Sequence, residues 1–483
     1  MRNVKALGFA IAFIVAVVSG MHSWWSPAAI AQTPSRPHIV YIMADDQGWK
    51  DVGFHGSDIQ TPNLDRLAQT GIRLEKYHAH PWCTPSRAAL MTGRYPFRYG
   101  FQTLVIPSAG TYGLPTDEWL LPQALKEVGY KTALVGKWHL GHADRQYWPL
   151  QRGFDYHYGP ILGEIDYFTH SAHGVVDWYR NNELVEEEGY VTTLLGQDAV
   201  KLIDEHDPET PLFMYLAFTA PHAPYQAPEE ALAQYAHIAD PSRRAYAAMI
   251  SVMDEQIGQV VEALERRGMR DNTLIVFQSD NGGPRSAAVT GEVDTSGGTI
   301  PADNGIFREG KGSLYEGGTR VVALANWPGQ IEPGSATDQP MHIIDWYPTL
   351  ASLAGAAPDP TKPLDGLNIW PALAEGTMME RDAVGFDVEP FRAAVHEGDW
   401  KLVWKVALPS RVELFNLAQD PGEATNLATQ NLRKVAQLKH QIEQMAQEAS
   451  PSLFLNEALG AAKSVLFTSV VTPEDAEAID NQP

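Results

Sequence analysis

Four apolar runs of strand length occur in the first 280 residues, and polar or charged side chains follow each of them closely. The runs cover residues 38–43, 131–135, 212–218 and 273–277. Near-continuous apolar runs of this length are typical of strands buried on both faces of a sheet. Between the runs apolar residues follow a helical spacing, most clearly in residues 246–264. This alternation predicts an α/β fold with a mostly parallel central sheet flanked by helices.

The pattern changes after about residue 380. The predicted elements there are strands within residues 391–404 and 412–417 and one amphipathic helix marked by apolar residues from Leu427 to Met445. We therefore expect a larger α/β domain at residues 32–380 and a smaller α+β subdomain with an antiparallel sheet at residues 381–483. Its expected role is to cover an edge of the central sheet.

Chemistry-bearing side chains gather just past the predicted strands. They are Asp45 and Asp46, then Lys137 and His139, then His222, and finally Asp280 and Asn281. In open α/β sheets ligands bind at the carboxyl ends of the strands. Carboxylates that converge there would repel one another unless a cation neutralised them. Carboxylate and amide oxygens favour a hard divalent ion, either calcium or magnesium.

Cys83 is the only cysteine among the 483 residues. Pro85 suits the first turn of a helix and Gly93 suits its end, so Cys83 is expected at a helix N-terminus, where negative charge is favoured. Arg87, four residues on, would face the same way. The alternative is a buried structural cysteine.

Four further side chains could add positive charge to the same place. Lys137 and His139 are two residues apart, so an extended backbone would put both on one side. His222 is held between prolines, and Lys311 lies between glycines that allow a close backbone approach. Each alone suits a solvated surface group. Together they would form a cationic cluster facing a metal, which suits a tetrahedral oxyanion, either sulfate or phosphate.

Two motifs resemble the signatures of the sulfatase family. They are Cys-Thr-Pro-Ser-Arg at residues 83–87, followed by Thr-Gly-Arg at residues 92–94, and Gly-Lys-Trp-His-Leu-Gly at residues 136–141. The resemblance runs from about residue 38 to 430, and residues 161–170 and 313–318 are most similar to the arylsulfatase B (N-acetylgalactosamine-4-sulfatase) branch. It implies an alkaline-phosphatase-like fold, one calcium ion, and oxidation of Cys83 to formylglycine by a maturation enzyme.

The resemblance also implies a role for each matched residue. Calcium would be bound by Asp45, Asp46, Asp280, Asn281 and the modified Cys83, and the sulfate pocket would be lined by Arg87, Lys137, His139, His222 and Lys311. One hydroxyl of the hydrated aldehyde would attack sulfur, and loss of a proton from the other would release sulfate. His222, alone or with Lys311, would protonate the leaving alcohol, and His139 would accept the second hydroxyl's proton.

The N-terminus and the charge balance bear on location and partners. Residues 1–31 have the positive start, apolar core and Ala29-Ile30-Ala31 site of a cleaved signal peptide, although an uncleaved anchor is the alternative. We therefore expect a secreted or periplasmic protein without stable membrane insertion after cleavage. The formal net charge of −23 and the lack of basic runs argue against a nucleic-acid partner.

The expected substrate is a sulfated carbohydrate or an aryl sulfate. Two rival functions stay open: a phosphodiesterase or phosphonate monoester hydrolase of the same fold, and a non-catalytic sulfoglycan-binding protein with an unconverted Cys83. Four residues around Tyr167 are candidate specificity groups or, equally, loop-packing residues: Asp166, His170, Asp177 and Trp178.

Overall fold

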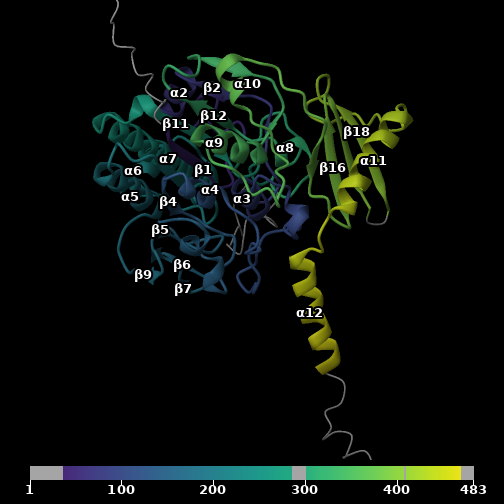
Figure 1. Ribbon diagram of the computed structural model, residues 1–483, viewed down its shortest axis with the longest axis horizontal. Helices are drawn as coiled ribbons and strands as arrows, with labels where there is room; N and C mark the ends of the chain where they lie inside the picture. Colours follow the sequence, from purple (N-terminus) through teal and green to yellow (C-terminus); the bar gives the residue numbers. More distant parts are fainter. Residues whose placement is uncertain (1–35, 286–300, 407–408, 469–483) are drawn as a thin grey trace, which may run out of the picture. The chain divides into compact units, whose positions relative to one another are not determined.

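A ten-stranded sheet forms the centre of the computed structural model, which describes residues 36–285, 301–406 and 409–468 (Figure 1). In spatial order its strands are β13 (Ser335–Thr337), β2 (Ile72–Leu74), β12 (Ala323–Asn326), β11 (Thr273–Ser279), β1 (His38–Ala44), β10 (Leu212–Ala217), β4 (Lys131–Gly136), β5 (Tyr156–Gly159), β8 (Tyr179–Arg180) and β9 (Glu183–Leu184). The five strands from β11 to β5 run parallel, which confirms the predicted α/β fold with a mostly parallel sheet.

β1 lies in the middle of the parallel strands and is buried along its whole length. Its alternate side chains enter two separate cores, because successive residues of a strand point to opposite faces. Ile39, Tyr41 and Met43 pack in one core, and Val40 and Ile42 pack in the other. The sheet is therefore covered by helices on both faces, as the apolar run predicted.

The two helical layers are built from different parts of the chain. Side chains of α2 (Pro62–Gln69), α5 (Val191–Glu205), α6 (Glu229–Gln234) and α7 (Pro241–Arg266) enter the core beside Val40. Side chains of α3 (Cys83–Thr92), α4 (Leu121–Glu127), α9 (Trp346–Ala354) and α10 (Trp370–Glu375) enter the core beside Tyr41. α7 contains the predicted helix of residues 246–264. The Asp240 side chain accepts a hydrogen bond from the Arg243 N–H at its start, which caps an otherwise unpaired donor.

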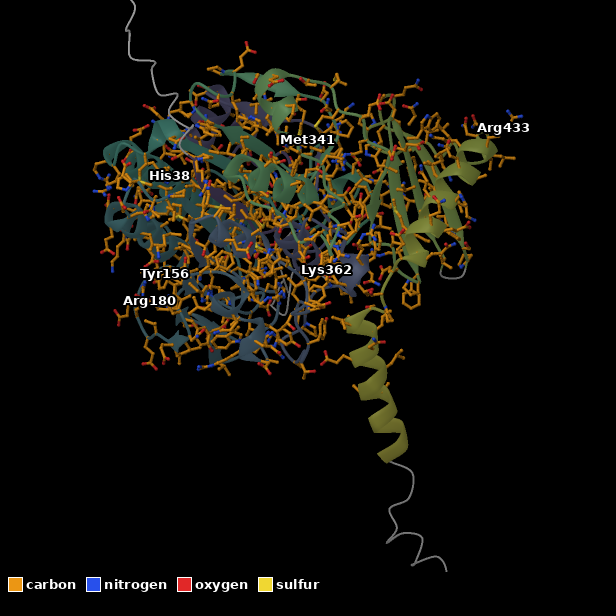
Figure 2. The ribbon with its side chains drawn as sticks, viewed as in Figure 1. His38, Tyr156, Arg180, Met341, Lys362 and Arg433 are labelled. Carbon is orange, nitrogen blue, oxygen red and sulfur yellow. The ribbon has the colours of Figure 1, made fainter. Side chains whose placement is uncertain are left out.

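Short elements occupy the connections. They are β3 (Tyr77–His78) paired with β14 (Met341–His342), the hairpin of β6 (Ser171–Ala172) and β7 (Val175–Val176), helix α8 (Glu316–Thr319), and 3-10 turns at Gly53–His55, Pro96–Tyr99, Arg145–Tyr147, Pro149–Arg152, Arg270–Asn272 and Ile343–Asp345. Figure 2 shows Tyr156 and Arg180 side by side on β5 and β8, where Arg180 donates to the Tyr156 hydroxyl.

A four-stranded antiparallel sheet follows, as predicted for the C-terminal part. It consists of β15 (Val384–Phe386), β16 (Arg392–Glu397), β17 (Trp400–Lys405) and β18 (Arg411–Asn416), and it is followed by α11 (Leu432–Gln447) and α12 (Leu453–Thr468). α11 packs on the middle strands of this sheet. The prediction was wrong at the start of α11, because Leu427 lies before the helix and Leu432 is 71% exposed.

The small sheet is joined to the rest of the chain by buried ion pairs. Lys401 on β17 lies 2.8 Å from Glu316 of α8 and 3.3 Å from Glu423. The Lys401–Glu316 contact joins β17 to α8, and the expected cover of a sheet edge stays a prediction. Residues from Pro37 onward group as one compact unit, and the boundary at residue 380 stays a prediction.

The prediction for the N-terminus concerns residues that the structure does not describe. The signal peptide predicted at residues 1–31 lies outside the described residues. Within the described ranges, none of the helices combines the length and apolar character that crossing a membrane needs.

Candidate active site

The register of the parallel strands brings the predicted polar residues to one edge of the sheet. Ala44 at the end of β1 pairs with Ser279 at the end of β11, so Asp45 and Asp280 leave the sheet side by side. On the other side of β1, Ala217 of β10 pairs with Gly136 of β4. Lys137 therefore leaves the sheet at the same level.

The acidic residues form a buried cluster. Asp45, Asp46, Asp280 and Asn281 are each at most 2% exposed. The Asp46 N–H donates to Asp280 Oδ1 at 3.3 Å, and Asn281 Nδ2 donates to Asp46 Oδ1 at 2.8 Å. Asp46 adopts a left-handed backbone with φ of 69°, which is uncommon for a residue other than glycine and turns the chain sharply after β1. All four predicted metal ligands of the strand ends thus lie together.

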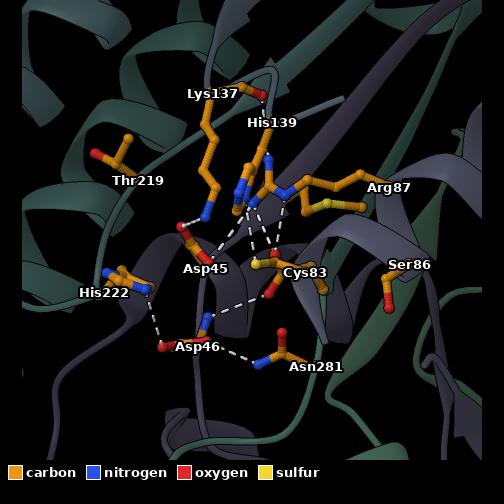
Figure 3. Close-up of polar contacts among 12 residues, drawn as sticks. Asp45, Asp46, Cys83, Ser86, Arg87, Lys137, His139, Thr219, His222 and Asn281 are labelled. Carbon is orange, nitrogen blue, oxygen red and sulfur yellow. Dashed lines mark hydrogen bonds and ion pairs between the residues drawn. The ribbon is translucent and has the colours of Figure 1, made fainter. Parts of the chain in front are cut away.

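Three cations lie against these carboxylates, and Figure 3 labels two of them, Lys137 and Arg87. Lys137 Nζ lies 2.5 Å from Asp45 Oδ2, and Lys311 Nζ lies 2.8 Å from Asp46 Oδ2. Arg87 donates from Nε at 3.0 Å and from a terminal nitrogen at 2.8 Å to Asp280 Oδ2. The cations predicted for the pocket are therefore assembled with the acidic cluster and partly neutralise it.

The mutual effects of these groups appear in their pKa values. Burial by itself would raise the pKa of Asp45, but Lys137, His222 and Arg87 outweigh it and lower this pKa. The pKa of Asp280 is raised by burial and then by the neighbouring Asp45 charge. Charges of the same sign are thus still crowded in this site, and a cation would relieve that repulsion.

Cys83 is the first residue of α3, as predicted. The helix runs from Cys83 to Thr92 and ends at Gly93, which takes a left-handed φ of 66°. Cys83 Sγ and one carboxylate oxygen each from Asp45 and Asp280 all lie within 4.8 Å of one another. Burial raises the pKa of the Cys83 thiol, so an unmodified side chain would stay protonated near neutral pH and would be a weak nucleophile.

His139 faces Cys83 from the loop after β4. Its Nδ1 lies 3.4 Å from Cys83 Sγ, and its Nε2 lies 3.0 Å from the Ile106 carbonyl oxygen. Burial and the Lys137 charge lower the pKa of His139 well below its ordinary value, so the ring is neutral. A carbonyl can only accept, so Nε2 carries the proton and Nδ1 presents a lone pair to residue 83.

The reason given for placing Lys137 and His139 together was wrong. β4 ends at Gly136, and His139 takes a left-handed φ of 58° instead of an extended backbone. Both side chains reach the site because the chain turns, with the His139 N–H donating to the Ile161 carbonyl at 3.1 Å.

His222 lies on the opposite side of the acidic cluster. Its Nδ1 donates to the Ala223 carbonyl at 2.6 Å, and its Nε2 lies 3.6 Å from Asp46 Oδ2. The Tyr167 hydroxyl lies 2.7 Å from the Thr219 carbonyl oxygen and 2.9 Å from that of His222. Tyr167 therefore supports the loop that holds this imidazole.

A cavity of about 370 Å³ opens above Cys83. Its lining comprises Trp82, Cys83, residues 104–108, His139, residues 162–164, His173, His222, Lys311 and Phe454. Glu164 lay inside the motif at residues 161–170 but was not singled out, and no sequence signal marked Phe454. The cavity gives a ligand access to three predicted pocket residues at once: His139, His222 and Lys311.

The four candidate specificity groups do not appear in this described lining. Asp177 accepts hydrogen bonds from the N–H groups of Ile161 and Leu162, at 3.3 and 2.8 Å. His170 and Trp178 are buried, and Asp166 accepts from the Phe168 and Thr169 N–H groups of its own turn. These residues hold the loop in shape, which was the alternative interpretation.

The site suits a divalent cation on its own geometry. Asp45 Oδ1 and Asn281 Oδ1 are buried acceptors with no hydrogen-bond partner. Buried polar atoms are rarely left without a partner. Oxygen donors of this kind, with three carboxylates close by, are the ligand set of a hard cation such as calcium.

Comparison with known proteins identifies the family. A family model described as Sulfatase matches residues 37–356, a range that contains all ten predicted site residues, and a second, described as N-sulphoglucosamine sulphohydrolase, C-terminal, matches residues 304–448. The chain belongs to the sulfatase family of sulfate ester hydrolases.

Individual relatives agree with this result. Arylsulfatase J of Mus musculus is 39% identical over 410 residues, covering 82% of this chain and 66% of that protein, just under two thirds of its length. N-acetylgalactosamine-6-sulfatase of Homo sapiens is 35% identical over 399 residues, covering 77% and 73%. The crystal structure of Ps i-CgsB in complex with k-i-k-neocarrahexaose superposes with a TM-score of 0.78 at 34% identity, covering 86% of this chain and 94% of that chain.

Proposed function

We propose that this protein hydrolyses sulfate esters with a formylglycine formed from Cys83. One observation carries the proposal. The Cys83 side chain lies within 4.8 Å of carboxylate oxygens of Asp45 and Asp280 and faces the lone pair of a neutral His139. In that position Sγ stands in for an oxygen of the hydrated aldehyde. A buried structural cysteine would need neither a cation site nor a proton acceptor.

The proposed metal is one calcium ion. Asp45, Asp46, Asp280 and Asn281 would hold it together with residue 83. Asp45 Oδ1 and Asn281 Oδ1, which accept no hydrogen bond, support this ligand set. When bound, the ion would neutralise the carboxylates and polarise oxygens of the nucleophile and the sulfate. Lys137 and Lys311, which pair with Asp45 and Asp46 here, would then be free to meet the sulfate oxygens.

The modified residue 83 would supply two hydroxyls on one carbon, one to attack sulfur and one whose deprotonation expels sulfate. His139 Nδ1 would accept the proton of the second hydroxyl, since its Nε2 proton is held by the Ile106 carbonyl. Arg87 would stabilise the oxyanion through the charge it already directs at Asp280. His222 Nε2, alone or with Lys311, would protonate the leaving alcohol.

The proposed substrate is a sulfated carbohydrate or an aryl sulfate. The names of the relatives support both, and Ps i-CgsB was crystallised with an oligosaccharide.

We assign the catalytic domain to residues 32–380 and the C-terminal subdomain to residues 381–483. The protein would be secreted or periplasmic after removal of residues 1–31, and would need a maturation enzyme for Cys83.

A combined chemical and kinetic test decides the proposal. Protein made with a formylglycine-generating enzyme should give a peptide around residue 83 with aldehyde mass and should turn over p-nitrophenyl sulfate. Cys83→Ser should make at most one sulfuryl transfer and then stall, because a serine ester lacks the second hydroxyl. A thiol-only peptide from a fully active preparation, or faster turnover of a phosphodiester than of the sulfate, would overturn it.

A further inference from the structure

Two polar side chains line the same cavity without belonging to the predicted sulfate-binding groups: Glu164 and His173. Glu164 follows Gly163, whose backbone packs against the His139 ring, and His173 faces it from another loop. His173 Nε2 lies 3.1 Å from Glu164 Oε1, with side chains 26% and 18% exposed. Both residues line the cavity together with Cys83 and Lys311.

The fold holds this pair in place. Glu164 lies in the loop whose start is fixed by the Asp177 carboxylate through the Ile161 and Leu162 N–H groups. His173 is at the tip of the β6–β7 hairpin, where its φ of 51° and the Gly174 φ of 78° match the two-residue turn that suits the twist of paired strands. The Glu164–His173 pair is therefore positioned by two separate supports.

The charges along the cavity are unevenly distributed. Among the described lining residues the basic groups are Lys311, His139, His222 and His173. The first three surround Cys83 and the carboxylates, and His173 is paired with Glu164, the acidic residue of the lining. A ligand with its sulfate near Cys83 would therefore meet the Glu164 carboxylate elsewhere in the cavity, where the described lining supplies no further lysine or arginine.

The remaining wall is apolar and the space is small. Trp82, Leu104, Pro107, Leu162 and Phe454 supply side chains that suit the apolar face of a sugar ring. The volume of about 370 Å³ is near the lower end of the roughly 300–1,000 Å³ found for small-molecule sites. A pocket of this volume accommodates one sugar ring with its sulfate.

We propose that this cavity is a subsite for a single sugar ring bearing one sulfate and no second anionic group. Glu164 accepts hydrogen bonds from ring hydroxyls, His173 fixes the carboxylate and bonds a neighbouring hydroxyl, and the Glu164 charge repels a second sulfate or a uronate. This inference rests on the proposed function, because it presumes sulfate at Cys83. It makes Glu164 and His173 the residues that select the sugar.

The test compares substrates on the matured enzyme. Glu164→Ala should lower kcat/KM for monosulfated galactose or N-acetylgalactosamine by about 10-fold or more, the effect of losing hydrogen bonds to a charged group. Glu164→Ala should lower kcat/KM for p-nitrophenyl sulfate several-fold less, because that substrate has no ring hydroxyls. Glu188→Gln, an exposed acidic residue that is not in the described lining, is the matched control and should leave both substrates unchanged.

A second variant isolates the charge. Glu164→Gln keeps the shape but removes the negative charge, so it should raise kcat/KM for a disulfated monosaccharide relative to the monosulfated one. Equal losses on sugar and aryl sulfates in Glu164→Ala, an unchanged preference in Glu164→Gln, or wild-type enzyme that cleaves only the aryl sulfate would each overturn the inference. Absence of aryl sulfate turnover in wild-type, aldehyde-bearing protein would instead overturn the proposed function.

Discussion

Asp45, Asp46 and Asp280 place three carboxylates in a water-excluded site at the ends of two neighbouring strands. Each is paired with its own cation, yet the pKa of Asp280 stays raised because burial and Asp45 both oppose its charge. A bound cation would relieve the repulsion among such crowded carboxylates. We therefore propose that the cluster binds a divalent cation.

Removing the metal should therefore lower both the activity and the stability of the protein. Chelation of the matured protein should abolish sulfatase activity and lower the melting temperature, and calcium should restore both, because a ligand at about 100 times its Kd adds about 2.7 kcal/mol of stability. The measurements are thermal unfolding and aryl sulfate turnover. Asp280→Asn should lose the calcium-dependent shift, whereas the exposed Asp271→Asn should keep it. Full activity in protein shown by elemental analysis to be metal-free would contradict the prediction.

At the scale of elements, the loop after β5 and the turn after β4 position each other. The His139 N–H donates to the Ile161 carbonyl, and Gly163 approaches the His139 ring so closely that an added Cβ would lie 2.3 Å from Cε1. The position of His139, the proposed proton acceptor, is thus set by Gly163, more than twenty residues away in the sequence.

Gly163→Ala should therefore displace His139 from residue 83 without unfolding the protein. We expect kcat for aryl sulfate to fall by about 10–100-fold, the size of effect that an ångström of misplacement produces. Gly460→Ala is the matched control, since an added Cβ there meets nothing within 4 Å. Circular dichroism should show both variants folded. Wild-type kcat in Gly163→Ala would show that the His139 position does not matter.

At the scale of the whole molecule, a buried ionic cluster joins the C-terminal sheet to α8, close to Lys311 in the chain. Lys401 is fully buried between Glu316 and Glu423, and His78 lies 3.0 Å from Glu316. Burial alone would raise the pKa of Glu316, but Lys401 and His78 hold it well below its ordinary value. The small sheet is therefore attached by charges that depend on one another.

Lys401→Met should destabilise the protein by about 3–5 kcal/mol, because two buried carboxylates would lose their cation. Chemical denaturation followed by fluorescence measures the effect. The exposed Lys201→Met on α5 should change stability by less than about 0.5 kcal/mol. If both variants unfold at the same denaturant concentration, the cluster does not join the sheet to α8.

The same cluster makes stability depend on pH through His396. Burial and the neighbouring His78 lower the pKa of His396 to about 3. The unfolded chain binds a proton at this residue below its ordinary pKa of about 6.5, whereas the folded protein does not until about 3, so the contribution of His396 to stability falls as the pH drops through this window. The slope is about 1.4 kcal/mol per pH unit.

His396→Gln should remove that dependence. Its melting temperature relative to wild type should rise steadily as the pH is lowered from 7 to 4, whatever the offset at pH 7. His440→Gln, on the exposed face of α11, serves as the control and should follow the wild-type curve. A constant difference between His396→Gln and wild type across this range would show that His396 does not act as described.

Local patterns predicted most of the elements. The apolar runs of β1, β4, β10 and β11 and the periodicity of α7 were apparent because burial on two faces or on one helical face leaves a repeat in neighbouring residues. The Pro85 and Gly93 signals placed Cys83 at the start of α3 for the same local reason. The start of α11 was missed because Leu427 continues the apolar pattern without belonging to the helix.

The sequence by itself determined the kinds of element, the helix end that carries Cys83, and the residue types available at the strand ends, since these follow from neighbours a few positions apart. Only the tertiary structure decided that β1 lies between β10 and β11, that His139 turns left-handed with Ile106 as its partner, and that Glu164 meets His173 over the cavity. Such contacts join residues that are distant in the chain or depend on loop geometry. Their energies come from burial and charge in three dimensions, which leave no periodic trace in the sequence.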